Sequence, residues 1–221
     1  MILSNDDSQI KRMTSQGSYK IVKLLMNEEP TGNKTKMYDA CESDPFFISD
    51  VHISMNTERT KKILDEINNK VSPQVPLIVL GDLTDKHTGT FNSTVEFVKS
   101  INTPNKFLII GNNDYYTIGD YIEMGFVYVT DEFTFKHNGQ NYILSHCPIP
   151  LTNKKAINIH GHLHGSNTYW NMSPAGHYDV FVGTDAEPKV IRMSELLLPE
   201  RMVRPQISTS SKINNNRILL H

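Results

Sequence analysis

The chain has 221 residues, of which 38% are hydrophobic and 21% charged, a composition that fits one soluble globular domain with at most an appendage. Its net charge of -2 gives no general attraction to nucleic acid or an anionic membrane, and no apolar run approaches the ~18 residues of a membrane span. The N-terminus lacks the basic start and apolar core of a secretory signal. Cys41 and Cys147 are far apart and indicate free thiols, so we expect a cytoplasmic protein without disulfides.

The first 44 residues are expected to form an N-terminal extension that precedes the main domain. It would comprise a polar arm to about residue 18, a strand or short helix at 19–26, and a turn or loop at 27–36. We expect the domain to cover residues 45–198 and a polar tail to follow at 199–221.

Within the domain, short apolar runs alternate with helical patterns. Strands are predicted at 45–49, 75–80 and 106–110, and helices at 57–70, 90–101 and 118–124. Further along we predict a strand at 126–129, an Asn-Gly hairpin of 132–136 and 140–145, strands at 156–159, 177–182 and 189–193, and a short helix from Ser194. This alternation indicates βαβ units, whose sites lie beyond the carboxyl ends of the strands.

Five of the predicted strand ends carry side chains that bind metal ions. These residues are Asp50, His52, Asp82, Asn112, His146, His162 and His164. His162 and His164 are two positions apart between glycines, so their side chains point to the same side of an extended segment. Each residue alone has a structural explanation, since Asp after a strand is a common turn former. Agreement among all five strand ends favours a metal site.

This set is larger than one ion needs, which indicates two divalent ions that share a carboxylate. Two ions about 3.5–4 Å apart suit in-line displacement at phosphorus, with a metal-bridging hydroxide as the nucleophile near neutral pH. Oxygen and imidazole ligands make Mn²⁺ the first candidate, with Fe, Zn, Ni and Mg as others. The chain has neither a Gly-x-Ser-x-Gly elbow nor a P-loop.

The motifs Asp50-x-His52, Gly81-Asp82, Gly111-Asn112-x-Asp114, His146 and Gly161-His162-x-His164, in that order, resemble the calcineurin-like metallophosphoesterase superfamily. The resemblance covers about residues 45–195, and the C-terminal part is similar to small single-domain members. It implies an α/β fold, a four-layer αββα sandwich of two mixed sheets flanked by helices. It also implies that one ion is held by Asp50, His52 and His164, the other by Asn112, His146 and His162, and that Asp82 bridges them.

At residue 113 the chain departs from that family's pattern, in which His follows the Asn and an acid comes next. By the resemblance, that His stabilises charge at phosphorus and protonates the leaving oxygen. Asn113 donates a hydrogen bond but supplies no proton near pH 7, so we expect slower turnover of esters with poor leaving groups. Some superfamily members lack this His and are still phosphodiesterases. Asp114 loses its usual partner and is expected to be a structural cap.

Several neighbouring residues have alternative explanations. Asp85 is expected to accept hydrogen bonds within its loop. Cys147 is a candidate soft ligand for zinc, but strand alternation favours a buried thiol that faces away from His146. His177 is a candidate for substrate binding from a late strand. The Arg-Gly of the superfamily's Ser/Thr protein phosphatases is missing after Asp82, which argues against a phosphoprotein substrate.

The leading hypothesis is a binuclear metal-dependent phosphoesterase that acts on a small phosphodiester, a nucleotide or a nucleic-acid end. One alternative is a non-catalytic protein-interaction scaffold of the same fold, for which loss of metal ligands is the expected sign. Another is a nuclease that needs partners, since the charge does not indicate autonomous binding of nucleic acid. The sequence carries no indication of oligomeric state.

Overall fold

The computed structural model describes residues 31–54, 57–85, 87–153, 155–166, 175–183 and 187–196. The helices in these ranges are α3 (Lys34–Glu42), α4 (Thr57–Lys70), α5 (Phe91–Ser100), α6 (Ile118–Met124) and α7 (Met193–Leu196). The strands are β1 (Thr31–Gly32), β2 (Phe46–Ile48), β3 (Leu77–Leu80), β4 (Lys106–Ile109), β5 (Tyr128–Thr130), β6 (Glu132–His137), β7 (Gln140–Ser145), β8 (Ala156–His160), β9 (His177–Asp179) and β10 (Ile191–Arg192). None of the helices in the described ranges has the length and hydropathy that crossing a membrane requires.

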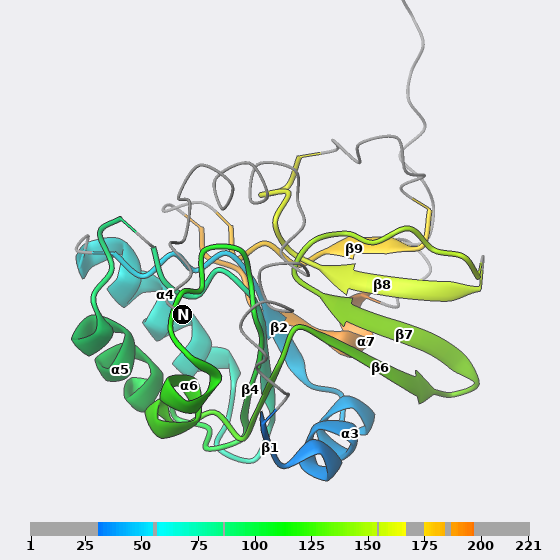
Figure 1. Cartoon of the computed structure of the whole chain (residues 1–221), viewed down its shortest axis with the longest axis horizontal. Helices are drawn as coiled ribbons and strands as arrows, with labels where there is room; N and C mark the ends of the chain where they lie inside the picture. Colours follow the sequence, from blue (N-terminus) through cyan, green and yellow to red (C-terminus); the bar gives the residue numbers. More distant parts are fainter. Residues whose placement is uncertain are drawn as a thin grey trace, which may run out of the picture.

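The strands form two mixed sheets, which lie beside each other in Figure 1. The larger sheet has the order β1–β5–β4–β3–β2–β10, with parallel pairing from β2 to β5 and antiparallel strands at both edges. The smaller sheet has the order β6–β7–β8–β9, in which only the β6–β7 pair is antiparallel. The predicted fold class, two mixed sheets flanked by helices, is confirmed.

Alternate residues of the central strands supply two separate hydrophobic cores. Ile48, Val79 and Leu108 belong to the core shared with α4, α5 and α6, which cover one face of the larger sheet. Their neighbours Phe47 and Ile78 belong to the second core, which also includes residues of the smaller sheet, α3 and α7. A strand buried on both faces needs apolar residues at every position, which explains the unbroken apolar runs in the sequence.

Most predicted elements are confirmed, and α4 has the predicted bounds. Asn138 and Gly139 join β6 and β7 with positive φ angles of 50° and 80°, as the predicted Asn-Gly turn requires. The predicted loop at 27–36 is wrong from residue 31, because β1 pairs with β5 and α3 begins at Lys34. The N-cap Asn33, whose side chain accepts a hydrogen bond from the Lys36 amide, is the sequence signal for that helix. The predicted arm, the element at 19–26 and the tail lie outside the described residues.

The two sheets meet where β2, β3 and β8 end. Past β2, the Asp50 amide donates to the Gly81 carbonyl at 3.1 Å, and the His52 amide donates to the Asp82 carbonyl at 2.9 Å. After β9, Phe181 bridges to Ser49, so that the segment following the smaller sheet continues along the larger one. The carboxyl ends of strands from both sheets are therefore brought to one junction.

Gly161, which follows β8, lies at this junction without room for a side chain. A Cβ added there would lie 1.6 Å from Ser49 Oγ and 2.7 Å from Asp50 Oδ2. Ser49 is fully buried, and its hydroxyl donates to the Leu80 carbonyl at 2.7 Å, so it cannot rotate away without losing that bond.

We expect Gly161→Ala to lower the free energy of unfolding by about 1–3 kcal/mol, the usual cost of overpacking. Urea denaturation monitored by circular dichroism measures the change. Gly119→Ala is the matched control, because its added Cβ would meet only Thr117 Oγ1 at 3.7 Å. Equal stability of the two variants would contradict the proposed close contact.

Candidate metal centre

All seven residues proposed as metal ligands lie at the junction of the two sheets. Asp50 and His52 follow β2, Asp82 follows β3, and Asn112 follows β4. From the smaller sheet, His146 follows β7, and His162 and His164 follow β8. The structure thus brings the seven together, while their binding of metal stays a prediction.

The backbone is strained at five of these seven positions. Asp50, His52, Asp82, His162 and His164 have positive φ angles between 47° and 71°. Non-glycine residues seldom adopt this left-handed conformation, and such conformations cost of order 1–3 kcal/mol each. Backbone strain of this kind collects at functional sites, where it directs side chains that regular strands would point elsewhere.

The first ligand group consists of Asp50, His52 and His164, whose ligand atoms lie within 4.8 Å of one another. His164 Nε2 is 3.3 Å from Asp50 Oδ1, and the rings of His52 and His164 stack with centroids 5.2 Å apart. Asp50 is fully buried, and its Oδ2 accepts a hydrogen bond of 2.9 Å from the His162 amide. That bond fixes the carboxylate of the first group to the backbone of a residue in the second.

The second ligand group consists of Asn112, His146 and His162, and it is centred on His146 Nε2. This nitrogen lies 3.0 Å from Asn112 Oδ1 and 3.2 Å from His162 Nδ1. The other ring nitrogen, Nδ1, donates to the Leu80 carbonyl at 2.8 Å, because a carbonyl only accepts. This bond sets the tautomer in which Nε2 is the ligand atom.

Asp82 lies between the two groups and directs one carboxylate oxygen at each. Its Oδ1 is 3.3 Å from His146 Nε2, and its Oδ2 is 3.7 Å from His52 Nε2. This is the arrangement that the sequence resemblance implied for a bridging carboxylate. Asp82 also accepts two hydrogen bonds from Asn113, at 2.8 Å from the amide and 2.6 Å from the side chain.

Asp114 holds the backbone of the loops that carry these ligands. Its Oδ2 accepts from the Asp82 and Gly111 amides at 2.9 and 2.8 Å, and its Oδ1 accepts from the Leu83 amide at 2.9 Å. The expectation that Asp114 is a structural cap is confirmed. Burial, together with the charge of Asp82, raises the pKa of the Asp114 carboxyl to about 6.

The electrostatics of the junction favour a cation. Burial opposes the charge on His146, but the hydrogen bond and charge of Asp82, with the charge of Asp50, raise the pKa of His146 to about 9. Burial also disfavours the Asp82 charge, yet the bonds from His146 and Asn113 lower the pKa of Asp82 overall. Two nearly buried carboxylates therefore draw positive charge to this point.

The donor set fits divalent ions. The ligand atoms of Asp50, His52 and His164 lie within 4.8 Å of one another, and His146 Nε2 lies 3.0 Å from Asn112 Oδ1 and 3.2 Å from His162 Nδ1. Imidazole suits zinc, iron, nickel and copper, and carboxylate or amide oxygen suits manganese and magnesium. Potential ligand atoms gather around Asp50 and around His146, with Asp82 between.

Asp85 and His177, which the sequence also singled out, lie outside the two ligand groups. Asp85 Oδ1 accepts from the His87 and Thr88 amides, both at 2.8 Å, so its predicted loop role is confirmed. His177 lies on β9 with its ring 5.6 Å from that of His160, and its role in substrate binding stays a prediction.

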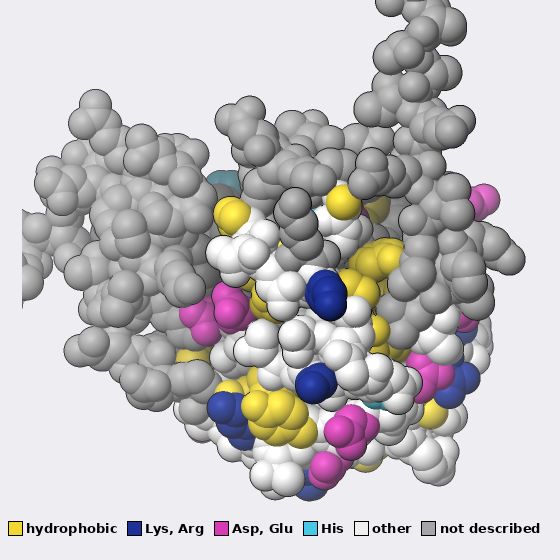
Figure 2. All heavy atoms as spheres, turned by 90° about the vertical axis from the view of Figure 1, so that its right-hand side faces the viewer, with side chains coloured by type: hydrophobic (Ala, Val, Ile, Leu, Met, Phe, Trp, Pro, Cys, Tyr) yellow, Lys and Arg dark blue, Asp and Glu magenta, His cyan; other side chains and the backbone are white. Residues whose placement is uncertain are grey.

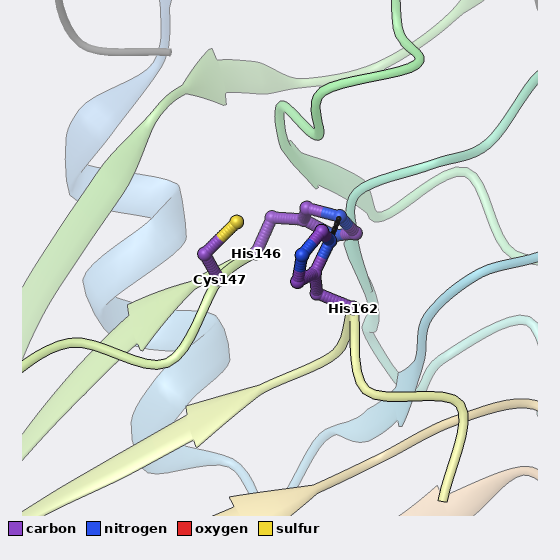
Figure 3. A group of neighbouring side chains, drawn as sticks. All are labelled: His146, Cys147 and His162. Atoms are coloured by element: carbon purple, nitrogen blue, oxygen red, sulfur yellow. Dashed lines mark hydrogen bonds between the residues drawn. The ribbon is translucent and has the colours of Figure 1, made fainter. Parts of the chain in front are cut away.

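Cys147 differs from the sequence expectation. The prediction that strand alternation turns its thiol away from His146 is wrong, because β7 ends at Ser145 and the following residues form a bend. The sulfur and one ligand atom each of His146 and His162 lie within 4.8 Å of one another (Figure 3). Burial, followed by the charges of Asp82 and Asp50, raises the pKa of this thiol to about 12.

Asn158, a fully buried residue of β8, is a positioning residue that the sequence did not indicate. Its side-chain amide donates to Ser145 Oγ at 2.9 Å and to the Ile143 carbonyl at 3.0 Å. Its carbonyl oxygen accepts from the Ile149 amide at 3.1 Å. These bonds hold both ends of the segment that carries His146 and Cys147. An Asn within an apolar strand was the available signal.

We expect Asp114→Asn to weaken Mn²⁺ binding by about 10–100-fold, because the new NH₂ group opposes amides that now donate to a carboxylate. Titration of metal-stripped protein with Mn²⁺ measures the affinity. Asp85→Asn is the matched control, since that carboxylate also caps a loop but lies on the surface. If both variants bind Mn²⁺ like the original chain, the proposed coupling between this cap and the ligands is wrong.

Comparison with known proteins agrees with the geometry. A family model described as calcineurin-like phosphoesterase matches residues 46–203, which is more than half of the chain. No curated protein matches the chain.

Similar solved structures include a protein of unknown function from Aquifex aeolicus, with 20% identity and a TM-score of 0.49 over 66% of this chain and 95% of that chain. The phosphoesterase Yfce from E. coli has 16% identity and a TM-score of 0.44 over 67% of this chain and 81% of its own. A predicted phosphoesterase from Streptococcus pneumoniae has 16% identity and a TM-score of 0.32 over 66% of this chain and 75% of its own. On the match of the family model, the chain belongs to the calcineurin-like phosphoesterase family and is a metal-dependent phosphoesterase.

Proposed function

We propose that this chain is a binuclear phosphodiesterase that uses two divalent ions to hydrolyse a small phosphodiester, a nucleotide or a nucleic-acid end. The observation that carries the proposal is the position of Asp82, which presents one oxygen to each of two ligand groups. A carboxylate shared in this way is what a pair of ions needs to lie about 3.5–4 Å apart.

The bound ions would supply a water of lowered pKa as the nucleophile and would neutralise charge at the phosphoryl group. The chain's own residues supply the positions. Asp50, His52 and His164 would hold one ion, and Asn112, His146 and His162 the other. Asp114 keeps the Asp82 loop in place through backbone amides, and the Leu80 carbonyl keeps the His146 ring in one orientation.

Asn113 supports Asp82 in this scheme and does not act as an acid. Its side-chain amide is committed to Asp82 Oδ2, and an amide supplies no proton near pH 7. The departing oxygen therefore leaves without help from this residue. The proposal accordingly favours substrates whose leaving group is stable as an anion.

An exposed aromatic cluster next to the ligand loops supports a substrate with a flat ring. Tyr115 follows Asp114 directly and is 49% exposed, and Phe91 is 40% exposed. The rings of Tyr115 and Tyr116 have centroids 4.3 Å apart, and those of Phe91 and Tyr116 lie edge to face at 5.2 Å. Nucleobases and aryl groups stack on such side chains.

The alternative readings have less support. A non-catalytic scaffold is expected to lose metal ligands, and this chain keeps all seven. A nuclease that binds long nucleic acid is expected to carry a basic patch. On the face over the smaller sheet, the described Lys and Arg side chains are interspersed with Asp and Glu (Figure 2). Substrates that reach the site as small molecules or chain ends agree better with this face and with the chain's net charge of -2.

We expect metal-stripped protein to hydrolyse bis(nitrophenyl) phosphate only after Mn²⁺ is added, and Asp82→Asn to lower kcat at least about 100-fold, because it removes a charge shared by both ions. Nitrophenolate release measures the rate. The nitrophenyl monoester is assayed alongside, and a faster diester reaction is the expected result. Asp85→Asn serves as a control with an acidic side chain removed from the same loop. Undiminished activity in Asp82→Asn would contradict the shared carboxylate.

We expect Asn113→His to accelerate hydrolysis of alkyl phosphodiesters by about 10²–10⁴-fold, the usual contribution of a general acid, while aryl diesters change much less. A series of esters with increasing leaving-group pKa measures this effect. The quantity compared is the slope of log kcat/KM plotted against the leaving-group pKa. Asn113→Ala separates the effect of the proton from loss of the bond to Asp82. An unchanged slope in Asn113→His would show that the leaving oxygen does not face residue 113.

A further inference from the structure

The thiol of Cys147 borders the second ligand group. Figure 3 shows its side chain beside the rings of His146 and His162, with the sulfur turned toward the pair. The sulfur of Cys147 and one ring nitrogen each of His146 and His162 lie within 4.8 Å of one another. Sulfur and two imidazole nitrogens form a donor set common in tetrahedral zinc sites.

The adjustment that coordination requires is small. In a tetrahedral site with Zn–S of about 2.3 Å and Zn–N of about 2.1 Å, the sulfur and a nitrogen lie about 3.6 Å apart. The sulfur lies at most 4.8 Å from one ring nitrogen of each histidine, which exceeds that value by about 1.2 Å at most. Cys147 is partly exposed and lies in a bend past the end of β7, so its surroundings do not lock it as a core side chain.

Cys41, the chain's other cysteine, shows what a purely structural thiol looks like in this fold. It lies on α3, is fully buried, and belongs to the core between the two sheets with Met37 and Phe47. It is in none of the clusters of potential metal ligands among the described residues. The two cysteines thus differ in burial, surroundings and neighbours.

We propose that Cys147 is a fifth protein ligand of the ion held by Asn112, His146, His162 and the shared Asp82, and that it makes this position selective for a thiophilic ion such as Zn²⁺, Co²⁺ or Fe²⁺ over Mn²⁺. The inference rests on the proposed metal centre and adds a ligand to one half of it. On binding, the thiol proton leaves to solvent and a sulfur–metal bond forms, with no change in oxidation state.

The proposal makes the two ion positions chemically different. The first group offers one carboxylate and two imidazoles, together with the shared Asp82, and so accepts ions that prefer oxygen and nitrogen. The second group would add a thiolate, which Zn²⁺ binds more tightly than Mn²⁺ does, although Mn²⁺ alone can still fill both positions at full loading. A mixed pair of ions, with the softer one at His146, is the expected occupancy.

Co²⁺ provides a test that does not depend on activity. Added to metal-stripped full-length protein, it should give visible d–d bands from any ligand set and a near-ultraviolet sulfur-to-cobalt charge-transfer band only if a thiolate coordinates. We expect Cys147→Ser to lose the near-ultraviolet band and keep the visible bands, and Cys41→Ser to keep both. In competition with Mn²⁺, Cys147→Ser should lower the preference for Zn²⁺ at least tenfold.

Thiol alkylation of the unmodified chain tests the same point without a variant. Bound Zn²⁺ should protect Cys147 from iodoacetamide, as measured by mass spectrometry, while the buried Cys41 stays unmodified with or without the ion. Visible bands without the near-ultraviolet band, or alkylation of Cys147 that Zn²⁺ does not slow, would overturn the proposed thiolate and leave the metal centre intact. Absence of all cobalt bands would overturn the metal centre together with it.

Discussion

The structure depends on two buried carboxylates that lie close together, Asp50 and Asp82. One oxygen of each carboxylate and one ring nitrogen of His146 lie within 4.8 Å of one another, and both carboxylates are almost inaccessible to solvent. Buried charges of the same sign are costly unless cations or hydrogen-bond donors compensate them. Here the compensation comes in part from the His162 and Asn113 amides and from His146. Two divalent ions would complete it, which ties the fold to the proposed chemistry.

The rest of the fold brings this negative charge to one place and keeps it there. The unbroken apolar strands β2, β3 and β4 fix the larger sheet between two cores, and β7 and β8 fix the smaller one. Left-handed backbone at Asp50, Asp82 and His162 then turns side chains into the junction. Hydrogen bonds hold this backbone in place: the Asp82 amide donates to Asp114, and the His162 amide donates to Asp50.

The sequence predicted most strands and helices, and the residues that meet at the junction of the sheets, because each rests on local information. Apolar runs such as Leu77–Leu80 specify a doubly buried strand, and the polar residue after each strand marks its carboxyl end. The separation of the proposed ligands into two groups came from the resemblance to a family. The spacing of residues along the sequence does not tell which of them lie next to one another in the fold. Long-range contacts such as His162 with Asp50 join residues more than a hundred positions apart.

Other features could not be predicted from the sequence for identifiable reasons. Helix α3 was missed because only Met37, Ala40 and Cys41 of its nine residues are buried, which gives a weak amphipathic pattern. The position of Cys147 was misjudged because alternation was extended past the last residue of β7. The hydrogen bond from the Asn113 side-chain amide to Asp82 depends on the distance between two loops, which no local sequence pattern indicates.

The most direct test of the central claim is the electron paramagnetic resonance spectrum of metal-stripped protein reloaded with two equivalents of Mn²⁺. A carboxylate that bridges two ions couples their spins, so we expect the multiline spectrum of an exchange-coupled pair, which should revert to uncoupled signals in Asp82→Asn. A spectrum of isolated Mn²⁺ ions in the unmodified chain, at full loading, would contradict a binuclear centre built around Asp82.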